Sequence, residues 1–427
     1  MARPELETLQ LERLRRLVSY LRERVPFYRE RLEGAPDVRS LEDVSRLPFT
    51  RKSDLRDTYP FDLLAVPREE CVRVHASSGT TGKPIIVAYT REDVDLFARV
   101  NARALAMAGG EPGMTLHNAY GYGLFTGGLG LHYGGERLGM TVVPVSGGMT
   151  ERQLLLIEDL RPDLVTCTPS YALTLAQAFA ERGVAPEEIS LRFACVGAEP
   201  WTEGMRVQID AGLGIRATNI YGLSEIIGPG VSNECVEARN GSHVNEDHFL
   251  PEIVETETGQ PVPDGEQGVL VLTTLTKQAL PLLRYWTGDI TSLNREPCRC
   301  GRTLARMALI SGRTDDMLIV RGVNVYPTQV ESILLRVPEL TPHYRLVVTR
   351  EGTLDEVDVE VEVTEECFQS LGGRLESPAV DPLATRVVEL IRETIGTSMR
   401  VTLLGPGHGP RSEGGKLARV DDRRRLE

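Results

Sequence analysis

The most informative segment of this chain reads Ser77-Ser78-Gly79-Thr80-Thr81-Gly82-Lys83-Pro84, and it directly follows a strand-like run at residues 71–75. Backbone N–H groups, hydroxyl groups and one ammonium group in such a loop can bind an anion, and a polyphosphate suits them best. The segment is not a Walker A motif, because that motif needs Gly where Ser77 stands and Ser or Thr where Pro84 stands. A solvated turn is the alternative interpretation. Lysine is scarce, with four residues against 44 arginines, so the place of Lys83 favours phosphate binding.

Composition limits the class of protein. A chain of 427 residues with 41% hydrophobic and 26% charged residues can form two or three globular domains. The net charge of −13 argues against a nucleic-acid partner or an anionic membrane surface. The sequence shows neither a signal-peptide pattern nor an apolar run of membrane-spanning length, and its seven cysteines indicate a reducing compartment. We therefore expect a cytoplasmic protein.

Hydrophobic periodicity predicts alternating strands and helices, an α/β fold. Helices are expected at 5–33 with a break at Pro26, and at 93–108, 150–160, 170–182 and 381–395. Strands are expected at 164–168, 191–196, 268–274, 345–349, 357–363 and 399–404. We expect a large N-terminal domain, 1–312, with mostly parallel sheets and flanking helices, and a small, mobile α+β lid, 313–427. The turn at 312–316 marks the boundary.

Four further segments carry candidate chemistry for activating a carboxylate with ATP. Residues 220–225 offer an aromatic face in Tyr221, a hydroxyl in Ser224 and a Mg²⁺ ligand in Glu225. Residues 284–289 end in Asp289, a carboxylate suited to two ribose hydroxyls. A charged turn at 312–316 and a Gly-rich segment ending in Lys416 follow. Each pattern alone is typical of an ordinary turn, helix cap or tail.

The order and separation of these segments resemble the adenylate-forming superfamily, and more closely its phenylacetate–CoA ligase branch. The branch-level matches extend over essentially the whole chain and comprise residues 24–29, 47–50, 75–84, 117–128, 197–200, 220–225 and 322–327. The Tyr/Gly-rich segment 117–128 is the most specific of them. This resemblance implies ATP, Mg²⁺ and coenzyme A as cofactor and co-substrates.

The resemblance also implies roles for individual residues. The phosphate loop would be Ser77, Ser78, Gly79, Thr80, Thr81, Gly82 and Lys83, with Thr80 and Lys83 catalytic. The nucleotide would also contact Gly197, Ala198, Glu199, Pro200, Tyr221, Gly222, Ser224, Asp289 and Arg313, while Glu225 binds Mg²⁺. Asp315 would be the hinge of the lid, Lys416 would stabilise the adenylation transition state, and Gly322 would line a thiol channel after the lid rotates.

The acid substrate is expected to be planar and aromatic, with phenylacetate the leading choice. Tyr120, Tyr122 and Phe125 cluster locally in a chain that is only 5% aromatic, although a role in the core is the alternative. The resemblance adds small apolar walls from Ala198, Ile220 and Pro229. Such walls suit a flat ring better than a long acyl chain.

A second group of residues, Cys235, His243, Cys298 and Cys300, could bind a structural Zn²⁺. The Cys298-Arg299-Cys300-Gly301 spacing can form a tight knuckle, but C-x-C is less diagnostic than C-x-x-C. Free thiols are an equally weighted interpretation, and a reactive or regulatory role is a third.

Three functions remain open from the sequence. The leading one is ATP-dependent formation of an aryl-AMP, followed by transfer to coenzyme A. The second is the same adenylation with delivery to a carrier-protein thiol. The third is a ligand-binding regulatory protein on a ligase scaffold, which the presence of Lys83, Glu225, Asp289, Arg313 and Lys416 disfavours. A homodimer is a further expectation.

Overall fold

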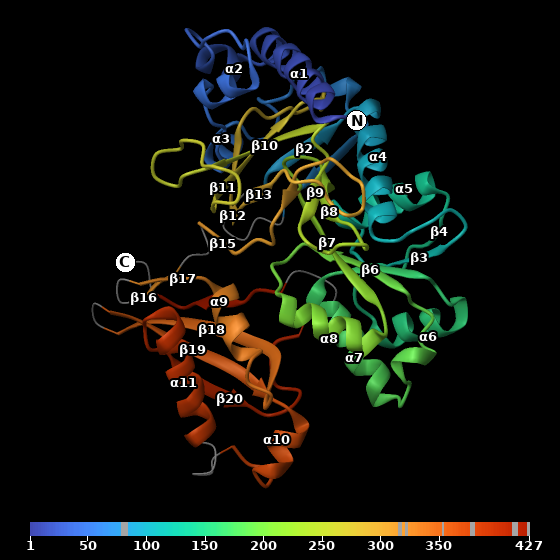
Figure 1. The fold of residues 1–427 in the computed structure, drawn as a ribbon, viewed down its shortest axis with the longest axis vertical. Helices are drawn as coiled ribbons and strands as arrows, with labels where there is room; N and C mark the ends of the chain where they lie inside the picture. The colour runs from blue at the N-terminus through green and yellow to red at the C-terminus, as the bar shows by residue number, and fades with distance from the viewer. Residues whose placement is uncertain are drawn as a thin grey trace.

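The computed structural model describes residues 1–77, 84–314, 318–320, 323–351, 354–375, 381–411 and 417–424. Figure 1 shows a large N-terminal part, blue to yellow, and a smaller C-terminal part, orange to red. None of the helices in these ranges is long and apolar enough to cross a bilayer.

The helices of the large part are α1 (Arg3–Arg24), α2 (Pro26–Arg31), η1 (Leu41–Arg46), α3 (Lys52–Asp57), η2 (Arg68–Glu70), α4 (Arg91–Met107), α5 (Gly127–Leu138), α6 (Thr150–Leu160), α7 (Pro169–Glu181), η3 (Pro186–Glu188) and α8 (Glu203–Leu213). Local chemistry sets several of their ends. The break expected at Pro26 is confirmed: α1 ends at Arg24 and α2 begins at Pro26, which lacks the N–H that would continue α1. Thr90 and Asp93 cap α4 reciprocally at 3.1 and 3.0 Å, and Gly139 and Gly214 end α5 and α8 in the left-handed conformation.

The main sheet has nine strands in the order β13-β14-β9-β8-β7-β6-β5-β3-β4. Their bounds are β3 (Thr115–Asn118), β4 (Thr141–Val143), β5 (Leu164–Cys167), β6 (Phe193–Gly197), β7 (Arg216–Leu223), β8 (Gly228–Glu234), β9 (Ser242–Val244), β13 (Leu293–Asn294) and β14 (Arg306–Met307). Strands β4, β3, β5, β6 and β7 pair in parallel, whereas the strands beyond β7 pair antiparallel. Parallel pairing is therefore confined to the strands with intervening helices, as the crossover geometry requires.

Two antiparallel units adjoin this sheet. One is a four-stranded sheet in the order β10-β11-β12-β15, formed by β10 (Phe249–Val254), β11 (Gly268–Thr274), β12 (Tyr285–Thr291) and β15 (Gly312–Arg313). The other is the hairpin of β1 (Arg73–Ala76) and β2 (Ile86–Tyr89). The candidate phosphate loop connects the two strands of this hairpin, so its ends are fixed by sheet pairing.

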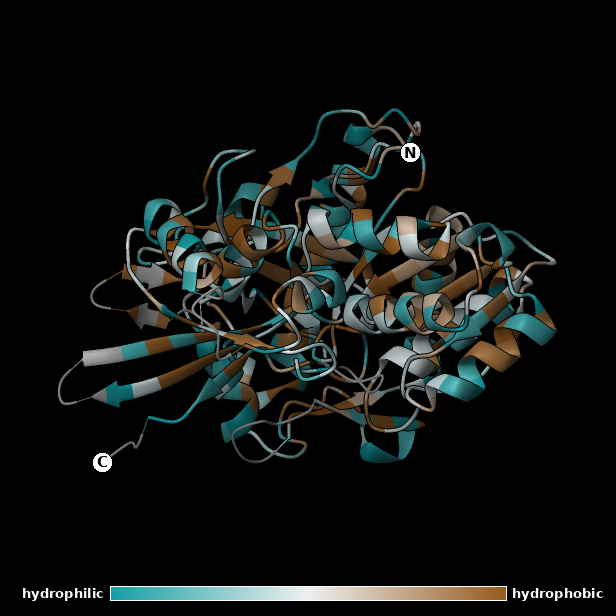
Figure 2. Cartoon of the chain, turned by 90° about the horizontal axis from the view of Figure 1, so that it is seen from below, coloured by the Kyte–Doolittle hydropathy of each residue, from teal (hydrophilic) through white to brown (hydrophobic). Residues whose placement is uncertain are grey.

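The C-terminal part has its own core. It contains β16 (Leu318–Val320), β17 (Val323–Val325), α9 (Pro327–Leu334), β18 (Leu340–Glu351), β19 (Leu354–Val363), α10 (Glu365–Ser370), α11 (Asp381–Ile395), β20 (Arg400–Leu404) and β21 (Val420–Asp422). Its sheet has the order β20-β19-β18-β21. The alternating Val residues of β19 point into a cluster that includes Val387 and Ile391 of α11. In Figure 2 the helices carry alternating hydrophobic and hydrophilic bands, as amphipathic helices do.

The two parts meet at α8 and α9. Leu335, which follows α9, packs against the core cluster of the large part that contains Met205 and Trp201. A Cβ atom at Gly204 would lie 3.1 Å from the Leu335 Cδ1 atom, so the absence of a side chain permits this close approach. Glu331 of α9 is buried at the same contact, with 2% of its surface exposed.

Burial raises the pKa of Glu331 to about 7, and the nearby carboxylate of Glu199 adds to the rise. Arg419, whose Nη2 atom lies 3.6 Å from Glu331 Oε2, acts in the opposite direction, as do the hydroxyl groups of Thr202 and Tyr344. The ionised carboxylate therefore costs folding free energy that the protonated carboxyl group does not.

Replacement of Glu331 by Gln is expected to raise the thermal midpoint at pH 8 and to change it little at pH 5. A carboxyl group with a raised pKa loses stability as the pH rises from its ordinary value to about 7, and the loss is constant above that. The neutral amide avoids this loss. Thermal unfolding of Glu331→Gln and of Glu393→Gln, an exposed control on α11, should be measured from pH 5 to pH 8. A pH-independent difference between Glu331→Gln and the unsubstituted protein would contradict the assignment.

Candidate active site

Asp289 lies where the two large sheets meet. It is on β12, opposite Arg313 of β15 in the sheet register, and its side chain is 4% exposed. The Tyr221 hydroxyl, from β7 of the main sheet, donates to Asp289 Oδ2 at 2.6 Å, and the Arg313 guanidinium contacts Asp289 Oδ1. Burial, reinforced by the Asp289 charge, raises the pKa of Tyr221 well above its ordinary value, so the phenol stays a neutral donor. The structure brings these three predicted residues together.

The turn after β7 holds Ser224 and Glu225, which are 9% and 7% exposed. Two buried groups, neither of them assigned a role from the sequence, fix the backbone of this turn. Lys277 Nζ donates to the Glu225 carbonyl oxygen at 3.1 Å, and the Tyr89 hydroxyl donates to the Ile227 carbonyl oxygen at 3.1 Å. Lys277 Nζ also lies 5.1 Å from the centre of the Tyr89 ring, a cation–π contact. Burial lowers the pKa of Lys277 to about 8.

The base of the candidate phosphate loop is closed by Ser77. Its N–H donates to the Ile85 carbonyl oxygen at 3.0 Å, and its Oγ accepts from the Ile85 N–H at 3.1 Å. The preceding strand contacts the Tyr/Gly-rich segment, since the Ala76 N–H donates to the Leu124 carbonyl oxygen at 3.0 Å. The hairpin and the candidate aryl pocket are therefore adjacent. The predicted residues Ser78, Gly79, Thr80, Thr81, Gly82, Lys83, Asp315, Gly322 and Lys416 lie outside the described residues.

The predicted aryl pocket corresponds to one apolar cluster. Tyr120 and Ile220 are buried in it, at 3% and 4% exposure, and Phe125 and Ala198 are partly buried against it. Tyr122 differs: its hydroxyl contacts Asn118 Nδ2 at 2.8 Å and His132 Nδ1 at 3.1 Å, which ties it to α5.

Pro229, on β8, packs against α5. A Cβ atom at Gly130 of α5 would be 2.9 Å from the Pro229 Cγ atom. The Tyr120 hydroxyl is buried and makes no hydrogen bond of regular geometry among the described residues. It is therefore a buried polar group within an otherwise apolar cluster, and the Gly197 backbone is the hydrogen-bonding group that acts on it.

The turn at residues 197–200 connects the aryl cluster to the nucleotide side. A Cβ atom at Gly197 would lie 2.1 Å from the Ile220 carbonyl oxygen, so only glycine fits between β6 and β7 there. Ala198 has a positive φ of 72°, which reverses the chain after β6. Glu199 then accepts hydrogen bonds from the Ser170 N–H at 2.7 Å and from the Leu417 N–H at 3.2 Å.

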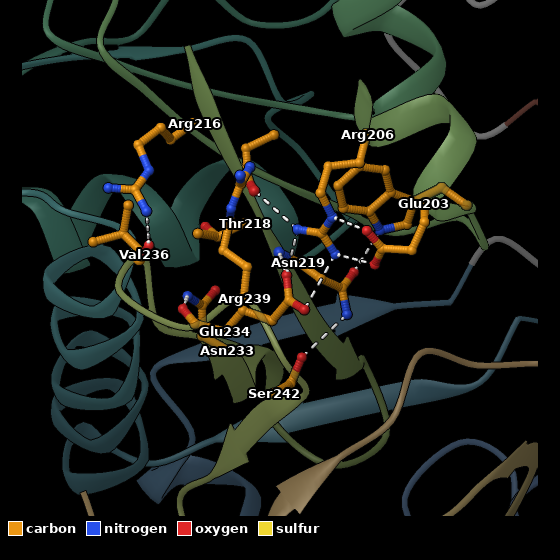
Figure 3. A network of polar contacts seen from close by, with 12 residues as sticks. Glu203, Arg206, Arg216, Thr218, Asn219, Asn233, Glu234, Val236, Arg239 and Ser242 are labelled. Carbon is orange, nitrogen blue, oxygen red and sulfur yellow. Dashed lines mark hydrogen bonds and ion pairs between the residues drawn. The ribbon is translucent and has the colours of Figure 1, made fainter. Parts of the chain in front are cut away.

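A buried ion pair lies close to this turn, and Figure 3 shows its two members, Arg206 and Glu234, within a network of polar contacts. Arg206 of α8 and Glu234 of β8 have side chains that are 4% and 1% exposed, and their Nη1 and Oε2 atoms are 2.7 Å apart. Arg206 also donates to the Ala217 carbonyl oxygen at 2.9 Å, and Glu234 accepts from the Asn219 N–H at 2.8 Å. The guanidinium covers the Trp201 ring at 4.7 Å. Arg206 Nε also lies 2.8 Å from Glu203 Oε2, so one buried arginine with two carboxylate partners connects strand β7 to residue 201.

The predicted metal ligands also meet. The ligand atoms of Cys235, His243, Cys298 and Cys300 all lie within 4.8 Å of one another. The Cys235 and Cys298 Sγ atoms are 3.8 Å apart, and Cys300 Sγ lies 3.5 Å from His243 Nε2. Tetrahedral zinc, with bonds of about 2.3 Å to sulfur and about 2.0 Å to nitrogen, requires S···S and S···N distances of about 3.8 and about 3.5 Å. The donor set therefore fits a closed zinc site.

Comparisons with known proteins place this arrangement among enzymes. The family model described as AMP-binding enzyme matches residues 25–275, and the model described as AMP-binding enzyme C-terminal domain matches residues 322–424. A phenylacetate-coenzyme A ligase of Thermus thermophilus is 63% identical, with all of each chain covered. One of Aromatoleum evansii is 49% identical over 99% of this chain and 96% of the relative.

Two solved structures of a 2-hydroxyisobutyryl-CoA ligase show different states of a similar protein. The complex with an acyl-AMP in the postadenylation state is 28% identical, covers 99% of this chain and 90% of its own, and has a TM-score of 0.91. The thioesterification-state complex is 29% identical, covers 99% and 91%, and has a TM-score of 0.73. The present structure thus resembles the postadenylation arrangement more closely.

Replacement of Arg206 by Met is expected to lower the free energy of unfolding by about 3–5 kcal/mol, because it leaves the Glu234 carboxylate buried without its partner. The control Arg216→Met removes an exposed arginine that donates to the Val236 carbonyl oxygen, and a change within about 0.5 kcal/mol is expected. Urea unfolding followed by fluorescence measures both. Equal losses in the two variants would show that the buried pair has no special role.

Proposed function

The chain belongs to the AMP-binding enzyme family, within its phenylacetate–CoA ligase branch, and from this membership we propose that it converts phenylacetate, ATP and coenzyme A to phenylacetyl-CoA, AMP and pyrophosphate. The observation that carries the proposal is the proximity of an apolar pocket to a nucleotide site. Ile220 faces the aryl cluster, and the next residue, Tyr221, donates to Asp289.

In the first half-reaction a carboxylate oxygen of the acid attacks the α-phosphorus, and pyrophosphate leaves. Asp289 accepts hydrogen bonds from the ribose hydroxyls, with Tyr221 and Arg313 holding its carboxylate in place. Ser224 contacts the α-phosphate, and residues 77–83 hold the β- and γ-phosphates. The backbone of Gly197, Ala198, Glu199, Pro200 and Gly222 and the ring of Tyr221 border the adenine, while the Glu199 side chain is bonded to Ser170 and Leu417.

Glu225 supplies one carboxylate for Mg²⁺, which suits an ion that takes its other ligands from phosphates and water. When bound, Mg²⁺ neutralises phosphate charge as pyrophosphate leaves. The hydrogen bond from Lys277 to the Glu225 backbone fixes the base of this side chain.

The aryl ring lies against Tyr120, Phe125, Ala198 and Ile220, with Pro229 on the far wall. Tyr122 shapes the pocket indirectly, through Asn118 and His132.

The second half-reaction transfers the acyl group to a thiol. We assign residues 1–312 to the adenylation domain and 313–427 to the lid, with Asp315 as hinge, Lys416 as the adenylation cation and Gly322 beside the thiol. Coenzyme A is the proposed acceptor, because the names of the full-length relatives specify it. The carrier-protein alternative has no such support, and the cytoplasmic location and homodimer stay predictions.

A structural Zn²⁺ held by Cys235, His243, Cys298 and Cys300 is part of the proposal. The Gly301 N–H donates to the Cys298 carbonyl oxygen at 2.9 Å, which forms the tight knuckle that presents both thiols. The site ties the 298–301 turn to β9 and to the end of β8. Four protein ligands leave no open position, so the ion has no place in the acyl transfer.

The proposed reaction is tested by measuring pyrophosphate release from ATP over a panel of aryl and aliphatic acids, with and without coenzyme A. Turnover is expected to peak with phenylacetate and to require coenzyme A. Faster pyrophosphate release with a different acid would overturn the assignment of phenylacetate as substrate. Release at the same rate with and without coenzyme A would favour the carrier-protein alternative. The absence of pyrophosphate release with every acid in the panel would overturn the enzyme function.

Metal analysis of protein purified without chelators is expected to find about one zinc per chain, since the four ligands complete one tetrahedral site. Cys298→Ser should lose the zinc and lower the thermal midpoint. Cys367→Ser, at another buried free thiol in the C-terminal part, should keep the zinc. If the purified protein contains no zinc and Cys298→Ser leaves its thermal midpoint unchanged, the cysteines are free thiols.

A further inference from the structure

Glu199 is in contact with both parts of the molecule. Each of its carboxylate oxygens accepts one backbone N–H: Oε1 from Ser170, in the first turn of α7, and Oε2 from Leu417 of the C-terminal part. A charged acceptor makes stronger hydrogen bonds than a neutral one, and the helix N-terminus adds a favourable field. The carboxylate therefore connects a fixed point of the large part to one backbone atom of the small part.

The large-part side of this connection is rigid. The turn that carries Glu199 begins where Gly197 is pressed against Ile220 and where Ala198 takes a positive φ. It ends at Trp201, which is 3% exposed and donates to Asn219 Oδ1 at 2.8 Å. These contacts all lie within the large part. The Glu199 carboxylate is thus positioned by groups that do not depend on the small part.

The small-part side is next to the proposed catalytic lysine in the sequence. Leu417 directly follows Lys416, and the chain then enters β21, which pairs in parallel with β18. The Leu346 N–H donates to the Arg419 carbonyl oxygen at 2.8 Å, so residue 419 is fixed within the small part. Glu199 holds the other end of this short segment, at the residue bonded to Lys416.

We propose that Glu199 is a positioning residue for the first half-reaction, which holds the segment after Lys416 against the large part through the Leu417 N–H. This inference rests on the proposed function and deepens it. When the lid rotates for thioester formation, the hydrogen bond to Leu417 breaks while the one to Ser170 remains. The bond therefore favours the adenylation arrangement alone, which agrees with the closer similarity to the postadenylation structure.

Charged groups from the C-terminal part surround the contact. Glu331 of α9 is buried near Glu199, and two carboxylates in one contact repel each other. Arg419, whose side chain also lies over the Tyr344 ring at 4.5 Å, offsets this repulsion. Arg419 therefore offsets the repulsion between Glu331 and Glu199 when the two parts of the chain are in contact.

The test separates the two half-reactions in Glu199→Ala. Pyrophosphate release in a single turnover is expected to slow about 10-fold, as for loss of a hydrogen bond to a charged group. Thioester formation from supplied phenylacetyl-AMP, and the KM for ATP, should stay within about 2-fold. Lys416→Ala is the comparator for a defect confined to adenylation, and Glu181→Ala, at the exposed C-terminal end of α7, is the control.

Glu199→Gln keeps one acceptor oxygen, so its rate of pyrophosphate release should fall less than that of Glu199→Ala. This variant also provides a test if Glu199→Ala folds poorly. Equal loss in both half-reactions would overturn the inference. So would a raised KM for ATP with unchanged maximal rate, since that result indicates an adenine contact instead.

Hydrogen exchange gives a readout that does not require activity. The Leu417 amide should exchange faster in Glu199→Ala than in the unsubstituted protein, whereas the amides of β21 should not change. Unchanged exchange at Leu417 would overturn the inference. If the unsubstituted protein forms no phenylacetyl-AMP, the proposed function fails, and the exchange measurement still decides whether Glu199 holds Leu417.

Discussion

The buried ion pair between Arg206 and Glu234 is the interaction on which the arrangement of the site depends. Both side chains are almost completely removed from water, so each charge needs the other and the backbone groups around them. Those groups belong to β7, through Ala217 and Asn219. Strand β7 contains Ile220 and Tyr221 and leads into the Ser224–Glu225 turn, so the pair supports the strand that carries the proposed aryl, ribose and metal contacts.

The second constraint is the meeting of two sheets. Tyr221 belongs to the main sheet and Asp289 to the four-stranded antiparallel sheet, and their hydrogen bond joins side chains 68 residues apart. Arg313 reaches the same carboxylate from β15, at the end of the large part. The proposed ribose site is therefore complete only when both sheets and the start of the connection to the C-terminal part are in register.

The turn at 197–201 links these constraints to the proposed lid motion. Ala198 borders the aryl cluster, Glu199 contacts Leu417, and Trp201 lies under Arg206. A single short segment thus contacts the apolar pocket, the C-terminal part and the buried ion pair. The close approach of Gly197 to Ile220 and the positive φ of Ala198 restrict the backbone conformation of this segment.

Local patterns were sufficient for many elements of the fold. The helix predicted at 381–395 is α11 with the same bounds, the helix predicted at 150–160 is α6, and Pro26 marks the break between α1 and α2. The 3.6-residue periodicity of a helix and the missing N–H of proline act within a few residues. Strand β18, by contrast, runs over 12 residues where five were predicted, because its length is set by pairing with β19.

The amino-acid sequence by itself determined the order of the motifs, and with it the family; it also supplied the candidate aryl-binding residues and the four zinc-ligand candidates. The tertiary structure alone decided which residues meet: Tyr221 with Asp289, Lys277 with the Glu225 backbone, and Glu199 with Leu417. It also placed the Tyr122 hydroxyl beside His132. The physical reason is that each of these contacts joins distant segments whose approach depends on sheet pairing and burial, and neither leaves a periodic signal in the sequence.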